Sequence, residues 1–290
     1  MTTTSMNTLF SMIAEKLGGT LIQHSPLTGG DISSVELLET NEHRFVVKSS
    51  TDTAAADMFE QEILALTSIA DTQTIAVPDV YLQGCEGDLN YLVMDYVASK
   101  KATLKDFERF GAELAELHAV SNPDFGWLHD NYIGSLQQSN KAHADWPIFY
   151  VQERLLPQFR MAFERKLLSA QDMPSEEVLM TRAYEILPST TAALLHGDLW
   201  SGNFLIAQNG APYLIDPAIY YGHGEVDLAM SRLFGGFDEI FYKAYHAVHH
   251  AQEGIECRQD WYKLYYLLVH LNIFGGAYFE AVKKIVARYF

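Results

Sequence analysis

The chain has 290 residues, of which 48% are apolar and 20% charged, a composition typical of a globular protein large enough for two lobes. Its net charge of −17 argues against nucleic acid as the main partner, because a phosphate backbone requires a basic face. An acidic surface favours cationic substrates such as amines, but it is also a common source of solubility. The sequence contains no apolar stretch of bilayer-spanning length, no signal-peptide pattern at its start and two cysteines. We therefore expect a cytoplasmic protein with neither nucleic-acid nor membrane partners.

The first third of the chain is predicted to consist mainly of β-strands. Residues 1–19 are typical of a short amphipathic helix, and residues 21–39 of two strands joined by a glycine turn. A β-rich run follows at 44–48, an amphipathic helix at 57–70 and a further apolar strand at 90–97. This pattern predicts a small antiparallel β-rich lobe with one helix.

The rest of the chain is predicted to be mostly helical. Thr103 and Asp106 have the spacing of a capping box, and an apolar stripe runs from Leu104 to Leu117 in the helix that they begin. Further helices are predicted at 145–168, 176–187, 225–234, 238–251, 261–274 and 276–289.

Two β segments interrupt the helices. Residues 192–195 form a short apolar strand, and residues 204–215 read as a hairpin with an Asn-Gly turn. A strand-rich lobe followed by a helical lobe is the architecture of protein kinases. We therefore expect an α+β, bilobal protein-kinase-like fold, with an ATP-binding lobe at 1–97 and a larger helical catalytic and substrate lobe at 98–290.

Residues 196–203, HGDLWSGN, indicate a kinase-type catalytic loop. In the kinase pattern H-R-D-x-x-x-x-N the aspartate base and an asparagine that binds magnesium are five positions apart. Asp198 and Asn203 have this spacing, so Asp198 is the candidate base and Asn203 a candidate metal ligand. Taken alone, the segment is also compatible with an ordinary turn rich in Gly, Asn and Asp.

Asp216 decides between these interpretations. It follows the apolar end of the predicted hairpin, where a carboxylate is costly unless it binds a cation or another partner. In kinases an aspartate at this point is the second magnesium ligand. The loop, the hairpin and Asp216 together predict transfer of the γ-phosphate of ATP to a small hydroxylated substrate, with Mg²⁺ held by Asn203, Asp216 and the ATP phosphates.

The first lobe is predicted to supply the remaining nucleotide contacts. Lys48, at the end of its strand, would contact the α- and β-phosphates, and Glu62 on the following helix would pair with Lys48. Gly29 and Gly30 would let the backbone approach the phosphates. Adenine is expected where the chain leaves this lobe, on backbone groups of Asp95, Tyr96 and Val97.

Two departures from the protein-kinase pattern concern regulation. Gly197 stands where protein kinases have the arginine that reads an activation-loop phosphate, and Asp216 is followed by Pro217 and Ala218 in place of Phe-Gly. The parts of the phosphorylation-controlled switch are therefore missing. We expect an enzyme that needs no prior phosphorylation.

The sequence resembles the fructosamine kinase family over most of its length. The likeness is carried by HGDLWSGN at 196–203 and by the run IDPAIYYGHGEVDLAMSRLFGGF at 215–237. FGWLHDNYIGSLQQSN at 125–140, DWPIFYVQERLLPQF at 145–159 and YYLLVHLNIFGGAY at 265–278 extend it. The resemblance implies a protein-kinase-like fold and ATP-dependent phosphorylation of ketosamines, chiefly at O3 of the sugar, which destabilises the adduct and restores the amine. Its substrates are small-molecule or protein-bound fructosamines, ribulosamines or erythrulosamines.

The family's functional residues match positions of this sequence. Asp198 matches its base, Asn203 and Asp216 its metal ligands and Lys48 its phosphate-binding lysine. Trp200 matches the loop tryptophan and is a candidate for substrate stacking, since an aromatic face suits a cationic amine. A buried aspartate that supports the loop backbone is matched by Asp227.

Two other functions remain open on the sequence alone. A kinase of the aminoglycoside or choline type would share the fold, because fold does not fix substrate. A nucleotide-binding pseudokinase would be a regulator and not an enzyme. The pseudokinase interpretation is disfavoured because the candidate lysine, base and both metal ligands are all present.

Overall fold

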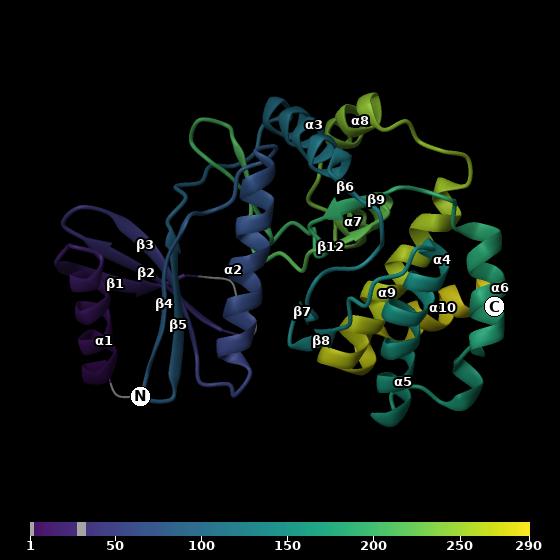
Figure 1. Cartoon of the computed structure of the whole chain (residues 1–290), viewed down its shortest axis with the longest axis horizontal. Helices are drawn as coiled ribbons and strands as arrows, with labels where there is room; N and C mark the ends of the chain where they lie inside the picture. Colours follow the sequence, from purple (N-terminus) through teal and green to yellow (C-terminus); the bar gives the residue numbers. More distant parts are fainter. Residues whose placement is uncertain (1–2, 28–32) are drawn as a thin grey trace.

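The structure, a computed structural model, describes residues 3–27 and 33–290. A β-rich part is followed along the chain by a mainly helical part (Figure 1). The β-rich part holds a five-stranded antiparallel sheet of order β1-β2-β3-β5-β4. Its strands are β1 (Leu21–Pro26), β2 (Ser34–Thr40), β3 (Arg44–Ser50), β4 (Val80–Glu86) and β5 (Leu89–Asp95). The glycine turn with Gly29 and Gly30 lies outside the described residues.

Helices α1 (Thr3–Lys16) and α2 (Ala55–Thr72) cover opposite faces of this sheet (Figure 1). Side chains alternate between the faces along a strand. On β3, Phe45 and Val47 pack in the cluster that includes residues of α1, whereas Val46 packs in the cluster that includes residues of α2. Lys48 therefore shares the α2 face, which is the face toward the helical part of the molecule.

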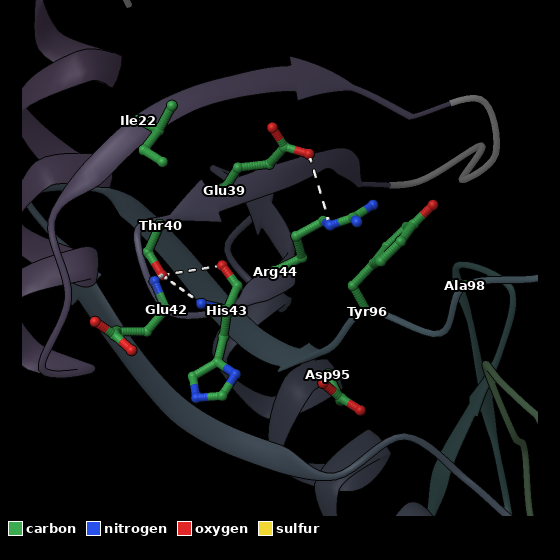
Figure 2. Close-up of a pocket in the computed structure, with 9 residues that line it drawn as sticks. All are labelled: Ile22, Glu39, Thr40, Glu42, His43, Arg44, Asp95, Tyr96 and Ala98. Atoms are coloured by element: carbon green, nitrogen blue, oxygen red, sulfur yellow. Dashed lines mark hydrogen bonds and ion pairs between the residues drawn. The ribbon is translucent and has the colours of Figure 1, made fainter.

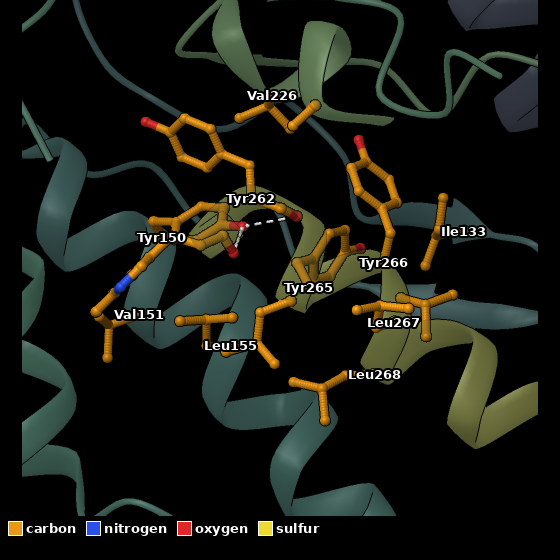
Figure 3. Close-up of a cluster of buried hydrophobic side chains, with 14 of the residues drawn as sticks. Ile133, Tyr150, Val151, Leu155, Val226, Tyr262, Tyr265, Tyr266, Leu267 and Leu268 are labelled. Atoms are coloured by element: carbon orange, nitrogen blue, oxygen red, sulfur yellow. Dashed lines mark hydrogen bonds between the residues drawn. The ribbon is translucent and has the colours of Figure 1, made fainter. Parts of the chain in front are cut away.

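The helical part packs around its longest helix, α9 (Ile255–Phe274). Figure 3 shows tyrosines and leucines of α9 packed against residues 150–155. The other helices are α3 (Leu104–Ala119), α4 (Trp146–Phe149), α5 (Leu156–Glu164), α6 (Glu176–Ile186), α7 (Glu225–Leu233), α8 (Glu239–Val248) and α10 (Phe279–Tyr289). Helix α9 begins at Ile255, earlier than expected, and residues 150–155 form a π-helical turn that the sequence did not indicate.

The capping box of α3 is confirmed. The Thr103 hydroxyl accepts a hydrogen bond from Asp106 N, and the Asp106 carboxylate accepts one from Thr103 N. The predicted apolar stripe is wrong at Leu104, which is 64% exposed, while Phe110 is buried. At 3.6 residues per turn, an offset of six positions places Leu104 about 120° around the helix from Phe110.

Short strands complete the fold. β9 (Ala192–Leu195) lies between β12 (Tyr220–Gly222) and β6 (Ser121–Asn122), and β10 (Phe204–Ile206) pairs with β11 (Pro212–Leu214). Gly210 has φ of +83° and turns the chain in the predicted hairpin. A further hairpin joins β7 (Asn131–Ile133) to β8 (Leu136–Gln138). Among the described residues, no helix is both long and apolar enough to cross a membrane.

Candidate active site

The predicted catalytic loop connects β9 to β10, and its first peptide groups are held from two sides. The two oxygens of the buried Asp227 carboxylate accept hydrogen bonds from His196 N at 2.7 Å and Gly197 N at 2.9 Å. From α9, the Tyr266 hydroxyl donates to the Gly197 carbonyl at 2.7 Å. Hydrogen bonds to backbone N–H groups on one side and to a backbone carbonyl on the other thereby fix the chain immediately before Asp198.

Position 197 has room for glycine alone. Its φ of +84° lies in the left-handed region that side chains rarely adopt, and a Cβ there would overlap the carbonyl oxygen of Ala218. The Ala218 N–H in turn donates to the His196 carbonyl at 2.9 Å. The departure from the protein-kinase arginine therefore has a steric cause, which is the close approach of the segment after Asp216.

His196 ties the loop to the end of the β10–β11 hairpin. Its Nε2 lies 2.9 Å from the Ile215 carbonyl, and its Nδ1 lies 3.2 Å from Asp198 N. Burial lowers the pKa of His196, so the neutral ring donates from Nε2 and accepts at Nδ1. The imidazole thus fixes the relative positions of the segments that carry Asp198 and Asp216.

Asp198 carries a carboxyl group whose pKa lies near neutrality. Burial and, secondarily, the charge of Asp216 raise the pKa of Asp198 from 3.8 to about 7. Asn203 opposes this shift by donating from Nδ2 to Asp198 Oδ2 at 3.0 Å and to the Asp198 carbonyl at 2.9 Å. Because Asn203 uses Nδ2 for both bonds, its Oδ1 remains suited to a metal ion.

Lys48 joins the sheet, α2 and the segment after the hairpin. Its Nζ lies 2.6 Å from Glu62 Oε1 and also forms an ion pair with Asp216 Oδ1. Burial alone would lower the pKa of Lys48, but the charges of Asp216 and Glu62 raise it above its ordinary value. The predicted pairing of Lys48 with Glu62 is present, and both groups lie beside Asp216.

The backbone at Asp216 turns sharply. Its φ of +53° is in the left-handed region, which aspartate tolerates better than most residues. Immediately before this turn, Leu214 N donates to the Ala76 carbonyl at 2.9 Å, and Ile215 N donates to the Asn203 carbonyl at 3.1 Å. The hairpin is thus attached to the chain after α2 on one side and to the catalytic loop on the other.

Asp95 and Tyr96 line a cavity of about 620 Å³ at the end of the sheet where the chain leaves it (Figure 2). The Arg44 guanidinium lies over the Tyr96 ring, 5.6 Å from its centroid. The cavity lining includes neither Val97 nor any of the residues around Asp198. Since Phe45 pairs with Asp95, Lys48 lies three residues, or about 10 Å, along β3 from this end.

Trp200 is the first residue of an aromatic surface beside the loop. Its side chain is 36% exposed, and its ring meets the ring of Phe234 edge to face at a centroid distance of 6.5 Å. Phe234 in turn contacts His270, and His270 contacts Phe274. Glycine at 202 makes room for the indole. The role of Phe234 beside Trp200, like that of Tyr266 behind the loop, was not predicted, although both lie in the segments that carried the family resemblance.

The oxygen groups present fit magnesium. Within residues 3–27 and 33–290, no three His, Cys, Asp or Glu side chains form a metal-binding cluster. Magnesium keeps several waters and is commonly bound by one or two protein groups plus substrate phosphates. The Asn203 amide and the Asp216 carboxylate supply that kind of donor set.

Comparison with known proteins decides the family. Residues 5–290 match the model of the fructosamine kinase family. The chain belongs to this family. A protein of Synechocystis named "Probable ketoamine kinase" is 38% identical over 265 residues, which cover 90% of this chain and 88% of the relative. The chloroplastic protein-ribulosamine 3-kinase of Arabidopsis thaliana is 34% identical, with 90% of this chain and 80% of that protein covered.

Solved structures confirm the fold. A Thermobifida fusca protein described as "putative fructosamine-3-kinase" has a TM-score of 0.84 and 30% identity, with 97% of this chain and 98% of that chain covered. An aminoglycoside phosphotransferase has a TM-score of 0.66 at 16% identity, with 99% of both chains covered. The predicted α+β, protein-kinase-like architecture and the predicted family are therefore both confirmed. The likeness to the aminoglycoside phosphotransferase is one of fold alone.

Proposed function

We propose that this protein is an ATP-dependent kinase that phosphorylates the sugar hydroxyl O3 of ketosamines and so promotes restoration of the parent amine. The observation that carries the proposal is the single contact network of Lys48, Glu62 and Asp216, next to the Asp198–Asn203 pair, in a member of the fructosamine kinase family. Relatives named ketoamine kinase and protein-ribulosamine 3-kinase support this substrate class.

Asp198 is the proposed general base. With a pKa of about 7, a large fraction of its carboxyl groups is ionised at neutral pH and can accept a proton. The sugar oxygen forms a bond to the γ-phosphorus as the bond from that phosphorus to the bridging oxygen breaks. ADP leaves, and the hydroxyl proton passes to Asp198. Most of the catalytic effect comes from position and charge, because phosphoryl transfer asks little covalent chemistry of the protein.

The first lobe, residues 1–97, is proposed to hold ATP, and residues 98–290 to hold the acceptor. Lys48 would bind the α- and β-phosphates, Gly29 and Gly30 would cover them, and adenine would meet the backbone of Asp95, Tyr96 and Val97. Asn203 Oδ1 and Asp216 would hold Mg²⁺, which neutralises charge on the phosphates when bound.

Trp200 is proposed to contact the substrate, because a partly exposed indole beside the base presents a face to the cationic amine of a ketosamine. Free small molecules and protein-bound adducts both fit an open aromatic surface of this kind. We assign the protein to the cytoplasm, in keeping with its two exposed free cysteines, Cys85 and Cys257.

The test measures ATP consumption with a ribulosamine, a fructosamine, kanamycin and choline, each with and without Mg²⁺. We expect magnesium-dependent turnover with a ketosamine and none with kanamycin or choline. Asp198→Asn should abolish turnover and leave ATP binding largely intact. Turnover confined to kanamycin or choline, or ATP binding without turnover on any acceptor, would refute the proposed function.

A further inference from the structure

The β7–β8 hairpin lies between α2 and α9, and β7 is close to the end of α2 where the helix begins (Figure 1). It belongs to the segment 121–143, which contains no candidate catalytic residue. Its sequence, NYIGSLQQ from Asn131 to Gln138, places two buried polar side chains, Asn131 and Gln138, at the two ends of the hairpin.

One side of the hairpin holds the segment that follows Asp216. Asn131 Nδ2 donates to the Ile219 carbonyl at 2.8 Å, and Gln138 Nε2 donates to the Ala218 carbonyl at 3.3 Å. The two amides are also joined, because Gln138 Nε2 donates to Asn131 Oδ1 at 2.8 Å. From α9, the Tyr265 hydroxyl donates to Gln138 Oε1 at 2.5 Å. Buried amides with this many partners impose one geometry on the backbone they bind.

The other side of the hairpin holds α2. Side chains alternate along β7, so Tyr132 points away from the buried Asn131 and Ile133. Its hydroxyl donates to Asp57 Oδ2 at 2.6 Å, a short hydrogen bond to a charged acceptor. Asp57 lies in the first turn of α2, and Glu62, which pairs with Lys48, lies on the same helix. Through Tyr132 the hairpin is therefore tied to the first turn of this helix.

These contacts close a ring. From Tyr132 it runs through Asp57 and α2 to Glu62 and then, by way of Lys48, to Asp216. The chain after Asp216 returns to the hairpin at Asn131. In regulated protein kinases, placement of the corresponding helix and of the segment after the metal-binding aspartate depends on a phosphorylated loop. Here only residues 217–224 separate Asp216 from α7, which is too few for such a loop. Residues 218–223 are held by hydrogen bonds to the catalytic loop, the hairpin, β9 and α9.

We propose that the β7–β8 hairpin is a built-in positioning element that holds the Lys48–Glu62 pair and Asp216 in register. Tyr132 is its positioning residue toward α2, and Asn131 and Gln138 are its positioning residues toward the segment after Asp216. The hairpin takes the place of a phosphorylation switch by making the assembled arrangement permanent.

The test removes the Tyr132 hydroxyl with Tyr132→Phe and its acceptor with Asp57→Ala. Each change is expected to lower kcat/KM about tenfold and to raise the Kd for MgATP, because a hydrogen bond to a charged group contributes about one factor of ten or more. The double variant should lose no more than either single variant, since both remove the same contact. Asp57→Asn keeps an acceptor oxygen and should lose less than Asp57→Ala.

A second cycle separates positioning from general stability. In a Glu62→Gln background, Tyr132→Phe should change kcat/KM by less than twofold, because the pair that it positions is already broken. Tyr184→Phe on α6, whose side chain is 55% exposed, is the matched control and should retain wild-type activity. The proposal is overturned if Tyr132→Phe stays within twofold of wild type, or if its loss is undiminished in the Glu62→Gln background.

The positioning role of the hairpin does not depend on which acceptor the protein phosphorylates. If the wild-type protein binds MgATP but turns over no ketosamine, the proposed function fails, and the Kd for MgATP still tests the hairpin. A severalfold rise of that Kd in Tyr132→Phe, absent in Tyr184→Phe, supports the positioning role. An unchanged Kd overturns it.

Discussion

Replacing Asp198 by asparagine should abolish turnover and at the same time make the folded protein more stable, by an amount that depends on pH. The pKa of Asp198 is raised from 3.8 to about 7, chiefly by burial, so folding favours its protonated form. The carboxyl group therefore does not destabilise the folded state below pH 3.8. The destabilisation grows as pH rises from 3.8 to about 7 and is complete above that range. At about 1.4 kcal/mol per tenfold change, the full cost above pH 7 is about 4 kcal/mol.

Asparagine is neutral and keeps an oxygen that can accept the bond from Asn203 Nδ2. Denaturant unfolding of Asp198→Asn and of the wild type at pH 5 and pH 8 checks the expectation. The variant should be more stable than the wild type by about 1–2 kcal/mol at pH 5 and by about 4 kcal/mol at pH 8. An equal difference at the two pH values, or a variant that is less stable at pH 8, would refute the reasoning.

Three further predictions concern the same site. The kcat/KM for the acceptor should rise with pH through about 7, because Asp198 must lose its proton to act as base, and a pH–rate profile that stays flat down to pH 5 contradicts this role. Lys48→Met should lower kcat/KM about 100-fold, because it removes the cation between Glu62 and Asp216. A loss of less than tenfold in steady-state kinetics would contradict the proposed role of Lys48. Gly197→Ala should destabilise the fold by about 3 kcal/mol, because its methyl group would overlap the Ala218 carbonyl. The control Gly235→Ala, at φ of +72° with no described atom within 4 Å of the added methyl group, should destabilise it by about 1 kcal/mol. Equal losses of stability in denaturation curves would contradict the steric explanation.

The set of candidate site residues could be drawn from the sequence because phosphoryl transfer requires certain residue types at fixed spacings. Asp198, Asn203 and Asp216 have that spacing, and Lys48 lies in a strand that is easily recognised by its β-branched residues, although β3 runs to Ser50 and does not end at Lys48 as predicted. The structure brings all four residues into one region. The amphipathic helices and the capping box of α3 were likewise predictable, since both depend on local signals.

The features that could not be predicted from the sequence depend on contacts between segments that are distant in the chain. The strands β7, β8 and β12 have three residues each, too few for an alternating pattern to appear. The bond between Tyr132 and Asp57 joins residues 75 positions apart, and no local feature of either residue indicates it. The reason for glycine at 197 was also inaccessible, because it depends on the carbonyl of Ala218 in a segment that folds back against the loop.

The close packing of Ala218 against Gly197 has a consequence for substitution at position 197. An arginine at 197 would require the Ala218 carbonyl to move, and that carbonyl accepts the hydrogen bond from the buried Gln138. We therefore expect that a single substitution to arginine at 197 would displace the segment after Asp216 from the catalytic loop.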